Sequence, residues 1–171
     1  MEPNLAAYTA FLLSVCGFPQ AVLNSNSALI QSTYNVAQAT VLADLGTIGF
    51  TDPFTGQQSS MGALALYNYG AALFIVYAVD PNGAAAVPGS NSTDNPSGLP
   101  FCAYTRSRYN INGYVSGTIQ SASDETTSQS MVVPDAAAGF TFDDLEVSKT
   151  PYGRRYLAIA QSAGSSLYGL V

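Results

Sequence analysis

Residues 60–79 read SMGALALYNYGAALFIVYAV, and no other segment constrains the architecture of the chain as strongly. The segment has no charged residue, and its apolar side chains cover nearly the whole circumference of a helix. Such a helix either lies at the centre of a helical bundle or spans a membrane. A span needs about 20 apolar residues flanked by cations, whereas this segment includes Asn68 and Gly70 and has no lysine or arginine nearby. We therefore predict a buried central helix over 60–79 and no membrane contact.

The residues before this helix predict two further helices within 4–46. Asn4 is placed to cap the first, in which apolar residues recur at steps of three and four. Ser25 or Asn26 caps the second, and Gly46 ends it.

The composition changes after the central helix. Residues 80–113 are rich in Gly, Pro, Ser and Asn and lack apolar periodicity, so we predict a long irregular excursion there. From 114 to 134 the pattern alternates with a period of two around a polar turn, which predicts a β-hairpin. A last helix over 150–164 follows, and the small and apolar residues 165–171 form a docking tail.

These patterns predict a mainly α protein in which residues 1–171 form a single domain. We expect a small bundle of about four helices with an inserted β-hairpin and a long irregular excursion.

The chain is poor in the side chains that most enzymes use. It has no histidine, two cysteines, five Lys or Arg and eleven Asp or Glu, which give a net charge of -6. Because histidine is the commonest general base and metal ligand, we expect no catalytic residue, no metal site and no cofactor. Charged residues make up only 9% of the chain and hydrophobic residues 47%, which indicates a largely uncharged surface that suits contact with other proteins. No cation precedes Arg106, and this disfavours tight binding of nucleic acid.

Residues 150–157 read TPYGRRYL and follow a hairpin pattern rich in Ser, Thr and Val and then a short apolar and acidic segment. This order of elements resembles the C-terminal signature of the head-to-tail connector, or adaptor, proteins of tailed bacteriophages. The resemblance in pattern extends over roughly residues 8–163. The chain departs from the family pattern at Ala72 and Leu145, where a histidine and a tryptophan are expected, and in the length of its excursion.

The resemblance implies a structural virion protein and not an enzyme. Copies of the chain would form a ring of twelve between the portal protein at the capsid vertex and the tail or a tail-completion protein. The ring would line the exit channel, through which DNA passes during ejection without specific binding. The resemblance also implies synthesis in the host cytoplasm and a final location in the neck of the virion.

Two groups of residues are candidate functional positions. A structural motif, in which the tyrosine fills the core and the glycine allows close approach of a neighbouring element, comprises Thr150, Pro151, Tyr152 and Gly153. The candidate interface residues are Tyr114, Ile119, Met131, Val133, Arg154, Arg155, Leu167, Tyr168, Leu170 and Val171. We expect the hairpin to pair with another chain through main-chain hydrogen bonds. The two arginines either meet an acidic partner or form a solvated face.

Other interpretations of the sequence stay open. The acidic run of Asp143, Asp144 and Glu146 is a candidate for acid–base chemistry or cation binding, although such residues before a helix are usually solvated or cap it. A secreted or surface-displayed adhesive or pilin-like subunit predicts a disulfide between Cys16 and Cys102, whereas an intracellular protein keeps two free thiols. The start of the chain is acidic, so we expect no secretory signal. Another phage tail-completion or tail-tube protein would be mainly β.

Overall fold

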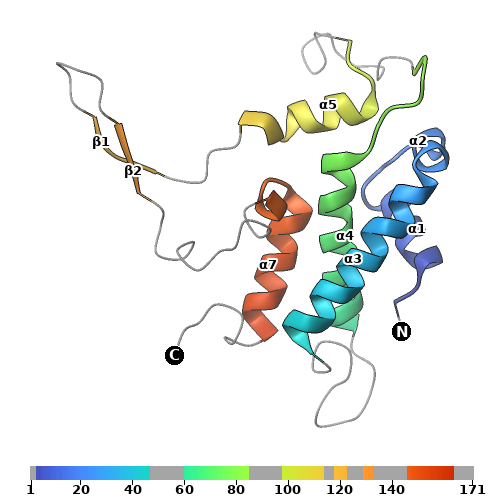
Figure 1. Ribbon diagram of the computed structural model, residues 1–171, viewed down its shortest axis with the longest axis horizontal. Helices are drawn as coiled ribbons and strands as arrows, with labels where there is room; N and C mark the ends of the chain where they lie inside the picture. Colours follow the sequence, from blue (N-terminus) through green and yellow to red (C-terminus); the bar gives the residue numbers. More distant parts are fainter. Residues whose placement is uncertain are drawn as a thin grey trace.

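The computed structural model of the chain describes residues 3–46, 60–84, 98–113, 118–122, 129–132 and 146–163. Within these residues the protein is mainly α, as the sequence predicts (Figure 1). The helices are α1 (Leu5–Ser14), α2 (Gln20–Ser25), α3 (Ser27–Leu45), α4 (Ser60–Tyr77), α5 (Phe101–Arg108), the 3-10 helix η1 (Ile111–Gly113) and α7 (Pro151–Ala163). The strands are β1 (Thr118–Ala122) and β2 (Gln129–Val132).

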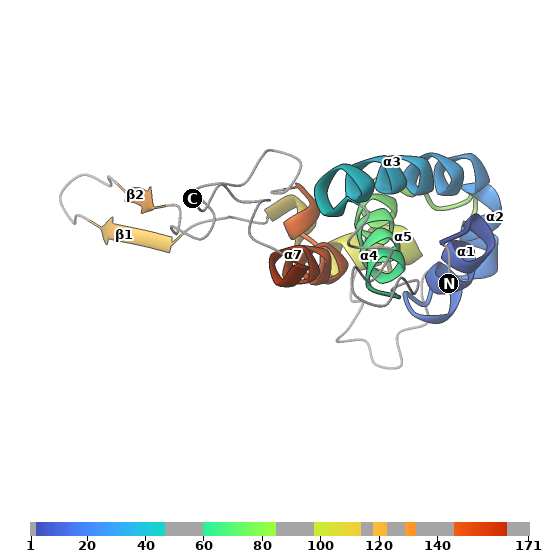
Figure 2. The same cartoon turned by 90° about the horizontal axis from the view of Figure 1, so that it is seen from below.

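Helix α4 lies at the centre of the helical body. Figure 2 shows it nearly end-on, with α3, α7 and α1 placed around it. Its middle is buried on all sides, through Ala65, Leu66, Asn68, Tyr69, Ala71, Ala72, Phe74 and Ile75. Its exposed large apolar residues, Met61, Leu64 and Tyr77, lie near its two ends. Among the helices that the structure describes, none combines the length and the apolar character needed to cross a membrane.

An aromatic cluster joins α1 to α3 and α4. Tyr8 of α1 is fully buried, and its hydroxyl lies 3.0 Å from Thr33 Oγ1 on α3. The centre of its ring lies 5.8 Å from that of Tyr34 and 6.0 Å from that of Tyr67. Gly70 of α4 makes this approach possible, because a Cβ at that position would lie 2.9 Å from the Tyr8 hydroxyl oxygen. The close contact of α1 with α4 therefore depends on a residue without a side chain.

The segment 4–46 contains three helices where the sequence predicts two. The additional helix, α2, follows Pro19, whose φ of -61° already suits the entry to a helix. Asn26 separates α2 from α3, since its φ of -113° and ψ of 26° are not helical. Its side chain makes no cap to α3 and instead donates a hydrogen bond to the Val79 carbonyl oxygen at 2.7 Å. The sequence predicts no helix over 20–25, so α2 is the difference, whereas α3 begins directly after Asn26, one of the two predicted cap positions.

The prediction that 80–113 is irregular is wrong for residues 101–108, which form α5, and for η1. The cap of α5 explains the error. Asp80 accepts hydrogen bonds from the backbone N–H of Cys102 at 2.8 Å and of Ala103 at 3.1 Å. Because this capping carboxylate lies far from α5 in the sequence, the residues around α5 do not contain a start signal. The described residues consequently hold six α-helices in place of about four.

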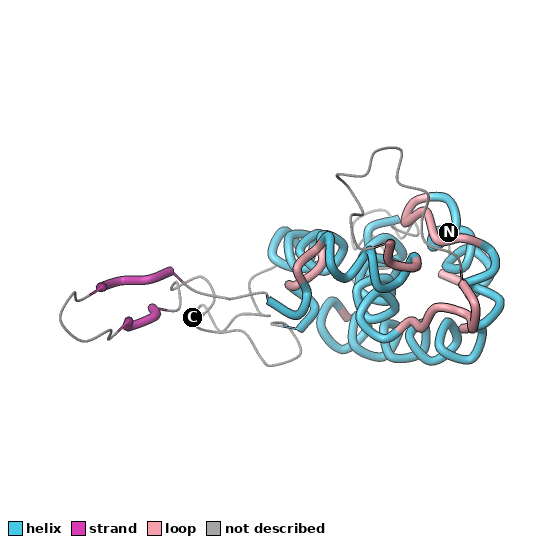
Figure 3. Tube along the Cα trace, turned by 90° about the horizontal axis from the view of Figure 1, so that it is seen from above, coloured by secondary structure: helices cyan, strands magenta, loops and turns pink. Residues whose placement is uncertain are grey.

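Strands β1 and β2 pair in an antiparallel register. Ile119 lies opposite Met131 and Thr118 opposite Val132, with an irregularity between Ile119 and Ser121. Figures 1 and 3 show both strands apart from the helices. The buried core of the described residues is therefore built by helices and the short segments that join them.

Candidate interaction surface

The surface of α1, α2 and α3 is nearly free of charge. Residues 3–46 contain one charged side chain, Asp44, and its carboxylate accepts a hydrogen bond from the Tyr156 hydroxyl of α7. Four large apolar side chains on or next to these helices are exposed: Leu13, Val15, Val36 and Leu42. Burying such a surface against another protein leaves no charge without a partner.

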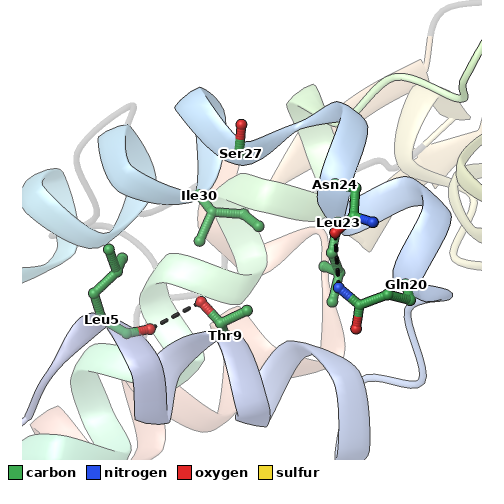
Figure 4. Close-up of a pocket in the computed structure, with 7 residues that line it drawn as sticks. All are labelled: Leu5, Thr9, Gln20, Leu23, Asn24, Ser27 and Ile30. Atoms are coloured by element: carbon green, nitrogen blue, oxygen red, sulfur yellow. Dashed lines mark hydrogen bonds between the residues drawn. The ribbon is translucent and has the colours of Figure 1, made fainter.

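A hollow of about 420 Å³ opens between the same three helices (Figure 4). Its lining residues are Leu5, Thr9, Gln20, Leu23, Asn24, Ser27 and Ile30. Leu23 and Ile30 are buried, while Gln20 Nε2 donates a hydrogen bond to Asn24 Oδ1 at 2.8 Å. None of the lining side chains ionises near neutral pH. The hollow suits an apolar side chain or a stretch of main chain from another protein.

The start of α7 has a specific local geometry. Pro151 is its first residue, and Thr150 Oγ1 accepts a hydrogen bond from the Gly153 N–H at 2.9 Å. A Cβ on Gly153 would lie only 1.7 Å from the carbonyl oxygen of Val147. The chain before α7 therefore packs directly on the helix backbone, at a distance that only glycine permits.

Tyr152 ties the start of α7 to the end of α1. Its hydroxyl donates a hydrogen bond to the Val15 carbonyl oxygen at 3.3 Å, and its ring lies edge-on to Phe11 with centroids 6.2 Å apart. Burial raises the pKa of the Tyr152 hydroxyl, and the nearby Cys16 thiol raises it further. The side chain is only partly buried, in contrast to Tyr156, which is 1% exposed. Tyr152 thus lies at the margin of the core and joins two helices there.

The predicted interface residues fall into three sets. Arg154 and Arg155 are both exposed on α7. Ile119 and Met131 are opposite one another in the pairing of β1 with β2, so the structure brings these two positions together. The others, Tyr114, Val133, Leu167, Tyr168, Leu170 and Val171, lie outside the described residues.

Sequence reasoning missed a polar clamp formed by Asn26, Asp80 and Arg106 at the end of α4. Arg106 Nη1 donates a hydrogen bond to the Ala78 carbonyl oxygen at 2.6 Å, so a side chain of α5 satisfies the C-terminal carbonyls of α4. Asn26 Oδ1 accepts from the Val79 N–H at 3.0 Å, and Asp80 caps α5 in return. The sequence marks Arg106 only as the first cation of the chain, which does not reveal its partner.

Both cysteines are free thiols in the structure. Burial raises the pKa of Cys16 to about 12, and burial together with the nearby Asp80 carboxylate raises the pKa of Cys102 to about 12. Because the thiolate is the reactive form of cysteine, both side chains are unreactive near neutral pH. The described part of the chain has no group of three His, Cys, Asp or Glu residues that could hold a metal ion.

These raised pKa values predict that the protein loses stability above a pH of about 9. An unfolded thiol ionises near 9.0, whereas the folded thiols keep their protons up to about 12, so the native state binds more protons in this interval. Their contribution is complete below the unfolded pKa and is lost as the pH rises from there. Burial also raises the pKa of Tyr8 and Tyr152 above 10.0, which extends the loss to higher pH.

The measurement is the urea midpoint of unfolding at pH values of about 7 and about 10.5. We expect a lower midpoint at the alkaline pH, and a smaller decrease in a variant with Cys16→Ala and Cys102→Ala. Equal midpoints for the unaltered protein at both pH values would contradict the burial of these groups.

Comparison with known proteins gives no match to a family model, a curated protein or a solved structure. A functional proposal for this chain therefore rests on its own residues, contacts and charges, together with the resemblance carried by residues 150–157.

Proposed function

We propose that this protein is a structural component of a tailed-bacteriophage virion, a head-to-tail adaptor that forms a ring between portal and tail. The observation that carries the proposal is the surface of α1–α3, where Asp44 is the single charged residue and is already bound by Tyr156. Such a surface can be covered by a neighbouring protein without the cost of burying an unpaired charge. The resemblance of the TPYG helix start to connector proteins gives the class of assembly.

In this proposal the chain acts by shape. The exposed apolar side chains of α1 and α3 and the hollow between α1, α2 and α3 provide contact area for a neighbouring subunit or for the portal. The inserted hairpin adds main-chain hydrogen bonds to another chain, a mode of association with low demands on sequence. The docking tail, 165–171, contributes apolar contacts to the portal.

The charge of the chain fits a channel through which DNA moves. A net charge of -6 repels the phosphate backbone, and repulsion permits sliding where a basic lining would retain the DNA. The ring is proposed to hold twelve copies, as the resemblance to connector proteins implies.

The test is a particle reconstruction of the virion neck, into which the described helices of this chain are fitted. We expect a closed ring of the chain between portal and tail. Its location elsewhere, such as on the outer face of the capsid, would rule out the adaptor role.

A pair of matched variants tests the surface that carries the proposal. Val36→Asp with Leu42→Asp places two charges on the exposed apolar positions of α3, and should give heads without tails when it replaces the unaltered chain. Ser32→Asp with Gln38→Asp adds the same charge at exposed polar positions of the same helix and serves as the control. Normal virions from the first variant would remove the α3 surface from the assembly.

A further inference from the structure

The charges of this chain are divided unequally along its length. The described residues carry all five cations and only three carboxylates, which gives them a net charge of +2. The other eight carboxylates lie outside the described residues and have no cation among them. They are Glu2, Asp52, Asp94, Asp124, Glu125, Asp135, Asp143 and Asp144. Among the described residues, cations therefore outnumber carboxylates.

The three described carboxylates already have partners within the chain. Asp44 accepts a hydrogen bond from Tyr156, Asp80 caps α5, and Glu146 forms an ion pair with Lys149. They are consequently not available to neutralise the exposed arginines of α7.

Arg154 and Arg155 form an adjacent pair of exposed cations near the start of α7. Arg154 Nη1 donates to the Ser148 carbonyl oxygen at 3.2 Å, which holds this guanidinium beside the helix start and leaves other N–H groups to donate. Arg155 makes no ion pair with any residue that the structure describes. Guanidinium groups bind carboxylates with paired hydrogen bonds, so this pair is suited to an acidic partner.

We infer that Arg154 and Arg155 of one copy bind an acidic segment of a second copy of this chain. The inference rests on the proposed function, because a ring requires two different surfaces of each subunit to meet in a repeated head-to-tail contact. Charge complementarity selects the occupant, since Arg154 and Arg155 are exposed cations of α7 and the same chain has eight carboxylates outside the described residues. Two pairs of adjacent carboxylates match the two adjacent arginines. These pairs are Asp124–Glu125 and Asp143–Asp144.

The first measurement is self-association by sedimentation velocity as a function of protein concentration and salt. We expect the unaltered chain to associate, and to do so less as sodium chloride rises from about 0.05 M to about 0.5 M. Arg154→Glu with Arg155→Glu should weaken association about tenfold or more. Because Arg154 also contacts Ser148, the single variant Arg155→Glu is measured beside it, with circular dichroism to verify the helical fold.

Mixing the arginine-reversed chain with a variant of each acidic segment identifies the segment that binds Arg154 and Arg155. Asp124→Lys with Glu125→Lys and Asp143→Lys with Asp144→Lys change the net charge equally, so each controls for the other. One of these two lysine variants should associate poorly alone. When it is mixed with the arginine-reversed chain, its association should return to within about threefold of that of the unaltered chain. The carboxylates replaced in that variant then belong to the docking segment. Pairing within one chain would not produce this recovery.

Several results would overturn the inference. These are a chain that stays monomeric at low salt and high concentration, arginine reversal without effect, or the failure of both mixtures to recover association. Retention of a duplex oligonucleotide that is lost on arginine reversal, without self-association, would assign the pair to phosphate and also overturn it. A ring seen in the virion neck together with any of these results would leave the adaptor role intact, so the two proposals fail separately.

Discussion

Replacing Gly153 with alanine is expected to destabilise the protein by about 3 kcal/mol, because it overfills a closed contact. The new Cβ would lie 1.7 Å from the carbonyl oxygen and 2.4 Å from the carbonyl carbon of Val147. These are backbone atoms, so the clash cannot be relieved by rotating a side chain. Helix α7 would have to move away from the segment before it, which also breaks the hydrogen bond from the Gly153 N–H to Thr150. Urea unfolding followed by circular dichroism measures the change.

Whether Gly153→Ala lowers or raises the free energy of unfolding distinguishes a closed contact from an open helical position. At an open helical position, replacing glycine with alanine stabilises a helix by about 1 kcal/mol. Ala158→Gly, at an exposed position of the same helix, is the matched control and should cost about 1 kcal/mol through helix propensity alone. A Gly153→Ala variant as stable as the unaltered protein, or more stable, would show that the close approach to Val147 does not exist.

Replacing Tyr8 with alanine is expected to cost about 4 kcal/mol, the largest effect of any single truncation in the α1 contact. The side chain is 0% exposed, and its ring packs between Tyr34, Tyr67 and the backbone of Gly70. Its removal leaves a cavity where α1 meets α3 and α4, and the surrounding helices can close it only in part. The free energy of unfolding from urea denaturation is the measurement.

Tyr8→Phe separates the hydroxyl from the ring. This variant keeps the aromatic packing but removes the partner of Thr33 Oγ1, so a cost of about 1 kcal/mol is expected. Thr33 keeps its hydrogen bond to the Leu29 carbonyl oxygen at 2.9 Å, which limits the loss. An equal cost for the alanine and phenylalanine variants would contradict the packing role of the ring.

The mainly α class and several helix ends were predictable because their causes are local. Asn4 Oδ1 accepts a hydrogen bond from the Ala7 N–H at 2.8 Å, which is the cap that the sequence predicts. Gly46 ends α3 with a positive φ of 54°, a conformation that favours glycine. Each of these signals acts on residues within about one helical turn, so the amino-acid order alone contains it.

The interaction surface was less accessible to sequence reasoning. The exposed arginine pair and the TPYG start of α7 were visible as residue types, but the contact of Gly153 with Val147 was not. Positions Val36 and Leu42 are apolar and lie on α3, yet periodicity does not state which side of a helix its neighbours leave uncovered. The predicted tail and most of the hairpin positions lie outside the described residues and stay predictions.

The sequence by itself determined that this is a helical protein whose first half has no cation and whose central helix must be covered on all sides, because composition and short-range spacing act through burial and local backbone preference. The tertiary structure alone decided that residues 101–108 form α5. Short helices are marginal in isolation, and here Asp80 supplies the cap of α5, while Arg106 and Asn26 bind the end of α4. Their partners are distant in the sequence, so these hydrogen bonds form only when the helices have packed together.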